Sequence, residues 1–409
     1  MAGIHVFTSA AANYLPKVKV LFDSLARHHP EWTRHLLLVE DWSEAQVADI
    51  ALDASVLQPK DLAIPEWRPW AFCHTMVELC TAVKPFMLGH LLGRESVEAV
   101  IYLDPDICVY SRLDEVLEAL ETCAVALTPH QTRPEATLSG VMANELTSLR
   151  YGTYNLGFIA VAAREEGRRF TDWWSSRTYR FCRDDVGNGL FTDQRWIDLV
   201  PGLFEGVKIL RHPRLNVASW NAHLRELELD EDGGVTVSGK PLGFYHFTGL
   251  DSGNHDVARA YLGGGGAAGR LLLQNYREAL AEPMRQYPYA DWSFGRFSDG
   301  TEITDSCRQV YRDNADLQVS FPDPWSDVGL MDALNGIEGT EAQPGYVSPG
   351  FGMGEGAQID FARVGSELAR AAAKPASWLA LLRALTRVWR REGWRGLRRR
   401  LSKSNEERM

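Results

Sequence analysis

The chain has 409 residues, of which 45% are hydrophobic, and a formal net charge of −11 at pH 7. These values allow a large core, either in one large α/β domain with appendages or in two or three domains. Such an acidic balance excludes a surface built as a whole to hold nucleic acid, so we expect no nucleic-acid partner.

The sequence indicates neither a membrane span nor a disulfide framework. It contains no apolar run long enough to cross a bilayer, and it begins directly with a strand-like run, so we expect no transmembrane helix and no signal peptide. The six cysteines are scattered and include no C-x-x-C pair, which favours reduced thiols over disulfides or a zinc site. We therefore expect a cytoplasmic location.

Strand-like and helix-like segments alternate over the first hundred residues. Continuous apolar runs predict strands that are covered on both faces, and apolar residues spaced three or four apart predict helices. Pro85 is expected to kink or interrupt the third helix. Such alternation predicts βαβ units and a mostly parallel, Rossmann-like sheet flanked by helices. The expected strands are 3–8, 34–40 and 98–104, and the expected helices are 14–30, 43–53 and 72–92.

The pattern is looser after Ser111. Residues 261–270 contain four consecutive glycines and read as a loose connection, and residues 271–360 are hard to assign and become Gly/Pro-rich. We therefore expect a main domain over 1–260, an extension and linker over 261–360, and a helical, basic tail over 361–409. The later expected strands are 123–129, 155–163, 207–217 and 241–250, and the expected helices are 167–182 and 193–204, the latter ending at Pro201.

Two carboxylates follow the strand expected over 98–104. Asp104 and Asp106 flank Pro105, which favours an extended backbone, and residues two apart in an extended segment point to the same side. Ligands of open α/β sheets bind beyond the carboxyl ends of the strands. Two like charges held close need a neutralising partner, and Mg²⁺ or Mn²⁺ suits carboxylate oxygens. The alternative is an Asp-Pro-Asp turn that only ends the strand.

Four other side chains are candidates for the same site. His246 ends an apolar run and is a candidate third metal ligand, although an isolated histidine is more often a core or edge residue. Asn155 begins a strand, where its amide can orient a hydroxyl group or serve a turn. Asp193 and Gln194 open the helix expected over 193–204, where an acidic residue often acts as a cap.

Together and in order, these pieces resemble one family. The segments that carry the resemblance span about residues 3–255 and are TSAAANYLPKVKVLFDSL, TAVKPFML, VIYLDPDICV, YNLGFIAV, TDQRWIDL and FYHFTGL. The chain resembles glycosyltransferases of the A-type fold, nearest to the retaining enzymes of family 8 and related bacterial polysaccharide glycosyltransferases. The resemblance implies transfer of a sugar from a nucleotide-diphosphate sugar, with a UDP-sugar as the commonest donor.

The resemblance also implies roles at the nucleotide end. Asp104, Asp106 and His246 match the family's metal ligands, and the cation would stabilise the leaving nucleoside diphosphate. Lys84 matches a basic residue that contacts the diphosphate or the donor sugar, where arginine is more familiar. The residues implied at the nucleotide are Thr8, Ser9, Asn13 and Tyr14, with Tyr14 stacking on the base.

Around the donor sugar, the resemblance implies roles for Asn155, Asp193 and Gln194. Asp193 would bind sugar hydroxyls and Gln194 would lie beneath the anomeric carbon, with front-face attack and retention of configuration. The chain departs from the family after His246, where HFTGLDSGNH lacks a lysine that the family usually has. Lys84, Arg195 or His255 would then help to hold the diphosphate, or the metal and the backbone suffice.

Other classes and partners stay open. A metal-dependent nucleotidyl- or phosphoryl-transfer enzyme also uses clustered aspartates, but it would normally have a Gly-rich turn where this chain has TSAAANY. An inactive carbohydrate-binding scaffold of the same fold is a further alternative. The acceptor can be a glycan, a lipid-linked intermediate or a protein, and a homo-oligomer stays open.

The tail carries a separate signal. From Arg370 to Lys403 it holds eleven Lys/Arg and one acidic residue, Glu392. Tryptophan and leucine recur there at helical spacing, which matches a basic interfacial helix on an anionic membrane at the cytoplasmic face. The alternative is a helix that packs on the acidic body or on a second subunit.

Overall fold

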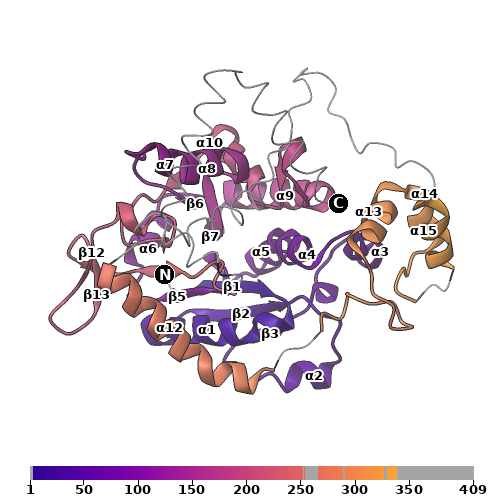
Figure 1. The fold of residues 1–409 in the computed structure, drawn as a ribbon, viewed down its shortest axis with the longest axis horizontal. Coiled ribbons are helices and arrows are strands. Elements are labelled where there is room, and N and C mark those ends of the chain that lie inside the picture. Colours follow the sequence, from indigo (N-terminus) through magenta and orange to yellow (C-terminus); the bar gives the residue numbers. More distant parts are fainter. Residues whose placement is uncertain (1–2, 252, 254–265, 289–290, 327–328, 339–409) are drawn as a thin grey trace, which may run out of the picture. The chain divides into compact units, whose positions relative to one another are not determined.

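The computed structural model describes residues 3–251, 253, 266–288, 291–326 and 329–338, which belong to one compact unit, residues 1–347. This part is a mixed α/β structure with a large central sheet flanked by helices (Figure 1). The fold class expected from the sequence is therefore confirmed. The expected basic tail and the Gly/Pro-rich linker from residue 339 onward lie outside the described residues.

The central sheet has seven strands in the order β10-β6-β7-β4-β1-β2-β3. Only β7 runs against its neighbours, so the sheet is mostly parallel, as predicted. The carboxyl ends of β1 and β4 consequently meet at one edge of the sheet, where a ligand is expected. The strands are β1 Ile4–Ala10, β2 Thr33–Leu38, β3 Ser55–Leu57, β4 Ala99–Leu103, β6 Val125–Pro129, β7 Tyr154–Ala162 and β10 Val207–Ile209.

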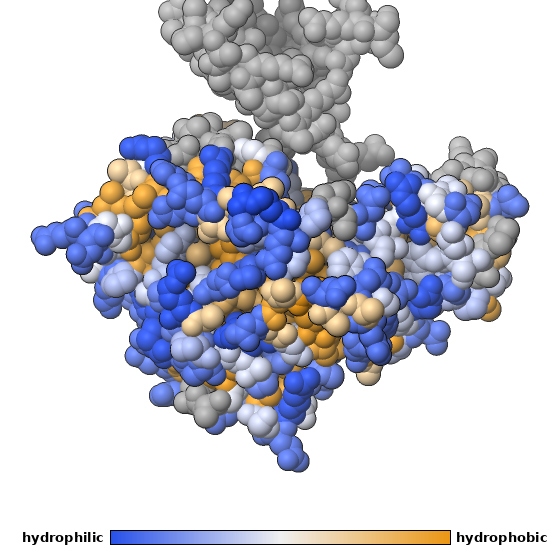
Figure 2. Space-filling view, turned by 90° about the horizontal axis from the view of Figure 1, so that it is seen from below, coloured by the Kyte–Doolittle hydropathy of each residue, from blue (hydrophilic) through white to orange (hydrophobic). Residues whose placement is uncertain are grey.

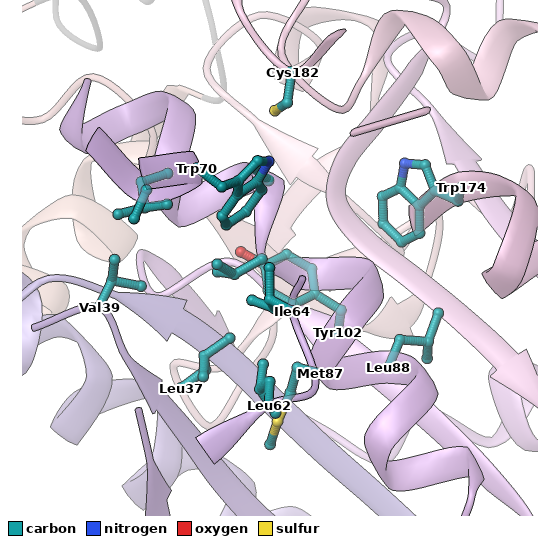
Figure 3. Packing of buried hydrophobic residues seen from close by; sticks show 14 of the residues in the cluster. Leu37, Val39, Leu62, Ile64, Trp70, Met87, Leu88, Tyr102, Trp174 and Cys182 are labelled. Carbon is teal, nitrogen blue, oxygen red and sulfur yellow. The ribbon is translucent and has the colours of Figure 1, made fainter. Parts of the chain in front are cut away.

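Successive side chains of the strands enter two different apolar clusters. Phe7 and Tyr102 pack on one face of the sheet, whereas Val6 and Ile101 pack on the other. On the first face, Leu37 and Val39 of the β2 region belong to the same cluster as Tyr102 and helical residues such as Trp174 (Figure 3). Burial on both faces explains why these strands read as continuous apolar runs rather than as alternating ones.

Helices cover both faces of the sheet. Helices α3, α4, α5, α9 and α13 contribute to the first cluster, and α1 and α6 contribute to the second (Figure 1). The helices are α1 Leu15–His28, α2 Glu44–Ala48, α3 Trp67–Phe72, α4 Met76–Ala82, α5 Lys84–Leu92, α6 Asp114–Leu120, α7 Leu138–Gly140, α8 Leu146–Tyr151, α9 Glu165–Phe181, α10 Val200–Leu203, α12 Gly266–Gln286, α13 Asp305–Asp313, α14 Ala315–Ser320 and α15 Leu330–Glu338.

The helical stretch around Pro85 is interrupted, as predicted. Thr75 caps α4 in a capping box with Glu78, α4 ends before Val83, and Pro85 lies in the first turn of α5. Proline is tolerated there because the first turn of a helix has no intrahelical partners for its N–H groups. The break places Lys84 at the start of α5, facing the carboxyl end of β4.

The predicted helix over 193–204 is only partly correct. Its first part is a 3₁₀ segment, Arg195–Leu199, and α10 follows it. Pro201 does not end the helix but lies in the first turn of α10, where it is tolerated. The expected strand over 207–217 is also divided, because β10 belongs to the central sheet and β11 (Val217–Ala218) to a second sheet.

A second sheet has the order β11-β15-β5, where β15 is Phe244–His246 and β5 is Ile107–Val109. It begins just beyond the carboxyl end of β4, because β5 follows β4 after a short turn. Helix α12 packs on α1 and on this sheet, where Tyr276 stacks on Phe247 with ring centroids 3.8 Å apart. The expected loose connection over 261–270 is therefore helical from Gly266. The remaining strands are β5 Ile107–Val109, β8 Asp184–Asp185, β9 Leu190–Phe191, β11 Val217–Ala218, β12 Leu227–Leu229, β13 Val235–Val237, β14 Lys240–Pro241 and β15 Phe244–His246.

The aromatic segment after residue 290 packs on the first face of the sheet. Trp292 donates a hydrogen bond to the carbonyl of Val39, and Ser293 donates to the buried carboxylate of Glu40. Glu40 also accepts from the N–H of Ala12 at 2.9 Å, so it joins this segment to the loop after β1. The extension thereby supports the same loop that leads to Asn13 and Tyr14.

Among the described residues, no helix combines the length and the apolar composition that crossing a membrane requires. The face that carries α12, α1 and α2 is mostly hydrophilic, with smaller apolar areas between the charged groups (Figure 2).

Candidate active site

Asp104 and Asp106 occupy the turn between β4 and β5. The Asp104 N–H donates to the carbonyl of Gly157 at 2.8 Å, and the Ile107 N–H donates back to the Asp104 carbonyl at 3.1 Å. Strand β5 pairs with β15 so that Ile107 lies opposite His246. This pairing brings a histidine from far along the chain next to the two aspartates.

The two carboxylates and the imidazole form one compact cluster. Nε2 of His246 lies 2.9 Å from Oδ1 of Asp106 and 3.6 Å from Oδ2 of Asp104, and one ligand atom from each residue falls within 4.8 Å of the others. Nε2 is buried and has no well-aligned hydrogen bond. Two carboxylate oxygens and an imidazole nitrogen that needs a partner are a donor set that fits Mn²⁺ or Mg²⁺.

Burial and charge act in opposite directions in this cluster. Burial opposes ionisation of Asp106, but the adjacent His246 imidazole outweighs it and lowers the pKa of Asp106. Burial likewise opposes the charged form of His246, but the Asp106 carboxylate raises its pKa. A bound cation would take the place of the imidazole proton.

Gly157 leaves the space that His246 occupies. A Cβ at this position would lie 2.5 Å from Cε1 of His246 and 2.8 Å from Oδ1 of Asn155. Both contacts are too short for a real side chain, so any larger residue would displace the imidazole. The glycine of YNLGFIAV thus has a steric role in the cluster.

Lys84 supplies a buried positive charge beside the aspartates. Its ammonium lies 3.2 Å from Oδ2 of Asp193, 3.5 Å from Oδ1 of Asp104 and 4.3 Å from the ring centroid of Tyr102. Burial opposes the charged amine, but the carboxylates of Asp104 and Asp193 outweigh it and raise the pKa of Lys84. The Tyr102 hydroxyl donates to Asp104 at 2.5 Å.

Gln194 lines the same region, but both ends of its amide bind backbone groups. Its Oε1 accepts from the Leu156 N–H at 3.0 Å, and its Nε2 donates to the carbonyl of Tyr151 at 3.0 Å. Thr192 adopts a left-handed backbone, with φ 45°, and its hydroxyl lies 3.2 Å from Oδ1 of Asp193. The turn therefore fixes the positions of Asp193 and Gln194.

Two cavities meet at this cluster. The larger has a volume of about 440 Å³, and among the residues that line it are Asn155, Asp193, Gln194 and His246. The smaller has a volume of about 260 Å³, and Asp106 is in its wall. Both cavities share the residues Val77, Thr81, Lys84, Asp104 and Thr248.

The smaller cavity lies at the carboxyl end of β1. Ser9, Asn13 and Tyr14 line it, and Ser9 donates to the carbonyl of Cys80 at 2.8 Å. Oδ1 of Asn13 is buried without a hydrogen-bond partner. Thr8 is fully buried within β1 and is not among the residues that line either cavity.

Three residues at the site carried no signal in the sequence. His130 and Trp220 line the larger cavity, and the Trp220 ring lies 5.5 Å from that of His246 in an edge-on arrangement. The buried Lys17 lies 4.0 Å from the centroid of the Tyr14 ring and 2.5 Å from Oδ2 of Asp251. The apolar spacing around Lys17 predicts a helix, but it does not indicate that Lys17 lies at a binding site.

No protein-family model matches the chain. Over 175 residues it is 29% identical to the uncharacterized protein YfnF of Bacillus subtilis strain 168, a match that covers 42% of this chain and 56% of that protein. Over 256 residues it is 23% identical to the uncharacterized protein YfnD of the same strain, covering 61% of this chain and 79% of that protein.

The chain is also similar to solved glycosyltransferase structures. One is the galactosyltransferase LgtC in complex with donor and acceptor sugar analogues (18% identity, 70% of this chain, 97% of that chain, TM-score 0.44). Another is the glycosyltransferase GlyE of Streptococcus pneumoniae TIGR4 (15%, 73%, 67%, 0.39). A third is mouse xyloside xylosyltransferase 1 (13%, 60%, 97%, 0.37).

Proposed function

We propose that the protein is a metal-dependent glycosyltransferase that uses a nucleotide-diphosphate sugar, with a UDP-sugar as the favoured donor. The observation that carries the proposal is the cluster of Asp104, Asp106 and His246 at the junction of two cavities. A donor of this kind has three parts: a nucleoside, a diphosphate and a sugar. The two cavities, with the candidate cation site where they meet, match the order nucleoside, diphosphate and sugar.

The smaller cavity suits the nucleoside. Tyr14 offers an aromatic face for stacking on a base, and Asn13 and Ser9 offer polar atoms for the base or the ribose. Asp104, Asp106 and His246 would hold the cation, which supplies Lewis-acid stabilisation of the departing diphosphate. Lys84 adds a fixed positive charge at the same junction.

The larger cavity suits the donor sugar and the acceptor. We assign Asn155, Asp193 and Gln194 to its floor, with Asp193 binding sugar hydroxyls and Gln194 beneath the anomeric carbon. Among the described residues of this cavity the acids are Asp104 and Asp193, and each lies within 3.5 Å of the Lys84 ammonium.

The Lys84 ammonium beside each carboxylate opposes nucleophilic attack by these two acids. Burial outweighs the Lys84 charge at Asp193 and raises the pKa of that carboxyl. This arrangement favours front-face attack, in which the leaving phosphate accepts the proton of the acceptor and the anomeric configuration is retained. NMR of the product linkage tests this point. An inverted linkage would instead require a free acidic base in the larger cavity.

The acceptor that we propose is a glycan, a lipid-linked intermediate or a protein, and the basic tail would hold the enzyme on an anionic membrane. The eleven basic residues between Arg370 and Lys403 support this location. The full chain should sediment with anionic vesicles and be released by salt, and truncation after Lys374 should abolish binding but spare donor hydrolysis. Retained binding after truncation would contradict the assignment.

A donor screen tests the proposed activity. Purified protein with Mn²⁺ is incubated with a panel of nucleotide sugars, and the release of nucleoside diphosphate is measured without acceptor. We expect slow hydrolysis of one donor, most simply a UDP-sugar. Release of pyrophosphate would indicate nucleotidyl transfer, and Mn²⁺-dependent donor binding without any turnover would indicate an inactive carbohydrate-binding scaffold.

A further inference from the structure

A hydrogen-bond network of three side chains connects the candidate metal-ligand cluster to a backbone carbonyl group. Nδ1 of His246 lies 3.2 Å from Oδ1 of Asn155. Nδ2 of Asn155 lies 3.3 Å from Nε2 of His130, and Nδ1 of His130 lies 3.3 Å from the carbonyl oxygen of Thr153. The network thus runs without a gap from a backbone carbonyl to a candidate metal ligand.

The Thr153 carbonyl, at one end of this network, fixes the direction of each hydrogen bond. A carbonyl oxygen can only accept, so Nδ1 of His130 must donate to Thr153. In a neutral imidazole the other nitrogen is then an acceptor, so Nε2 of His130 accepts from the amide nitrogen of Asn155. The amide is thereby oriented with its oxygen toward His246, whose Nδ1 must donate.

The geometry at His246, the other end of the network, agrees with these directions. When Nδ1 of His246 carries its proton, the lone pair available to a cation is that of Nε2. Nε2 is the atom that faces the carboxylates of Asp104 and Asp106. A reversed amide would place the proton on Nε2 and leave no lone pair toward the cluster.

We infer that His130 is a positioning residue that fixes the ring tautomer of His246 through the amide of Asn155. The inference rests on the proposed metal site and adds a residue that touches neither the cation nor the reacting atoms. Groups of this kind, which hold a metal-bound histidine in one orientation, typically change metal affinity about 10–100-fold when they are removed.

The surroundings of His130 suit this role. Burial lowers its pKa to about 4, so the imidazole is neutral near pH 7. Its carbonyl oxygen accepts from Nε1 of Trp220 at 3.2 Å and from Nδ2 of Asn221 at 2.9 Å. These two bonds use the backbone and therefore persist when the side chain is changed.

The test measures Mn²⁺ binding to the full-length protein without nucleotide, by titration calorimetry or by the EPR signal of free Mn²⁺. His130→Leu removes the acceptor for the Asn155 amide, and we expect Mn²⁺ affinity to fall about 10–100-fold. His130→Gln keeps a carbonyl acceptor and should restore most of the affinity. Thermal unfolding of each variant reports whether the fold is kept.

A second parent variant, Asn155→Asp, distinguishes a loss of His246 orientation from a general loss of structure. In Asn155→Asp the carboxylate can only accept, so Nδ1 of His246 must donate whatever residue occupies position 130. His130→Leu should then cause no further loss of Mn²⁺ affinity in Asn155→Asp. An equal loss in both backgrounds, or no loss in either, would overturn the inference. If the unchanged protein itself fails to bind Mn²⁺, the proposed metal site is what fails.

Discussion

The ammonium group of Lys84 lies 3.2 Å from the carboxylate of Asp193, and both side chains are almost fully buried. They come from segments more than one hundred residues apart, the start of α5 and the turn before the 3₁₀ segment Arg195–Leu199. Lys84 lines both cavities, and Asp193 lines the larger one. Each of the two charged groups depends on the other, because either one would be costly to bury alone.

Removal of only one partner should therefore destabilise the fold. Lys84→Met leaves the Asp193 carboxylate buried without its cation, and we predict a loss of about 3–5 kcal/mol in the free energy of unfolding. The double variant Lys84→Met/Asp193→Asn should recover most of that loss. Urea denaturation measures both.

A surface pair provides the control for this prediction. Lys19 pairs with the exposed Asp23 one helical turn away, and Lys19→Met should cost less than about 1 kcal/mol. If the single and double variants at the buried pair are equally unstable, the two charges do not compensate one another.

The glycine beside the metal-ligand cluster gives a steric prediction. Gly157→Ala would bring a methyl group to 2.5 Å from the His246 ring, so we expect the imidazole to move away from Asp106 and Mn²⁺ affinity to fall at least about tenfold. The matched control is Gly187→Ala, where no atom lies within 4 Å of the added methyl group. Unchanged Mn²⁺ binding in Gly157→Ala would mean that His246 is not a ligand.

The candidate metal ligands illustrate what the sequence could and could not reveal. Asp104 and Asp106 were predictable because two acids follow an apolar strand, and strand ends are where ligands bind. That His246 joins them depends on the pairing of β5 with β15, two three-residue strands separated by more than one hundred residues. The apolar run that ends at His246 made this histidine a candidate ligand, but the pairing of two such short strands could not be predicted from the sequence.

Other parts of the fold were predictable to different degrees. The break in the helix at Pro85 could be anticipated from the properties of proline, and the Thr75–Glu78 capping box is itself a sequence signature. His130 could not be predicted, because an isolated histidine after a strand has many uses and its partner, Asn155, lies on another strand. Trp292 and Trp325 lie outside the helices and strands, and they are positioned by packing in the first apolar cluster, which no local sequence pattern predicts.

Buried histidines should make the protein sensitive to acid. Burial lowers the pKa of His74 to about 3, and its Nδ1 donates to the Trp70 carbonyl at 2.8 Å. Below an unfolded-state pKa of about 6.5, the unfolded chain binds a proton that the folded protein resists, so stability falls as the pH drops from about 6.5 toward 3. At pH 5 this one residue should cost about 2 kcal/mol.

Replacement of that histidine isolates its contribution. His74→Asn keeps a donor for the Trp70 carbonyl but does not titrate. Between pH 7 and pH 5, the unchanged protein should lose about 2 kcal/mol more unfolding free energy than the variant. Parallel losses in both proteins, measured by urea denaturation, would show that His74 is not the acid-sensitive group.

The most direct measurement for the proposed metal-dependent nucleotide site is calorimetric titration of UDP in the presence of Mn²⁺ and in EDTA. We predict binding that requires Mn²⁺ and that Asp106→Asn abolishes while the unfolding temperature is kept, because this substitution removes a charged ligand from the cation. Asp23→Asn, an exposed acid on α1, should bind UDP as the unchanged protein does. UDP binding of equal strength in EDTA, or full Mn²⁺-dependent binding by Asp106→Asn, would contradict the proposed site.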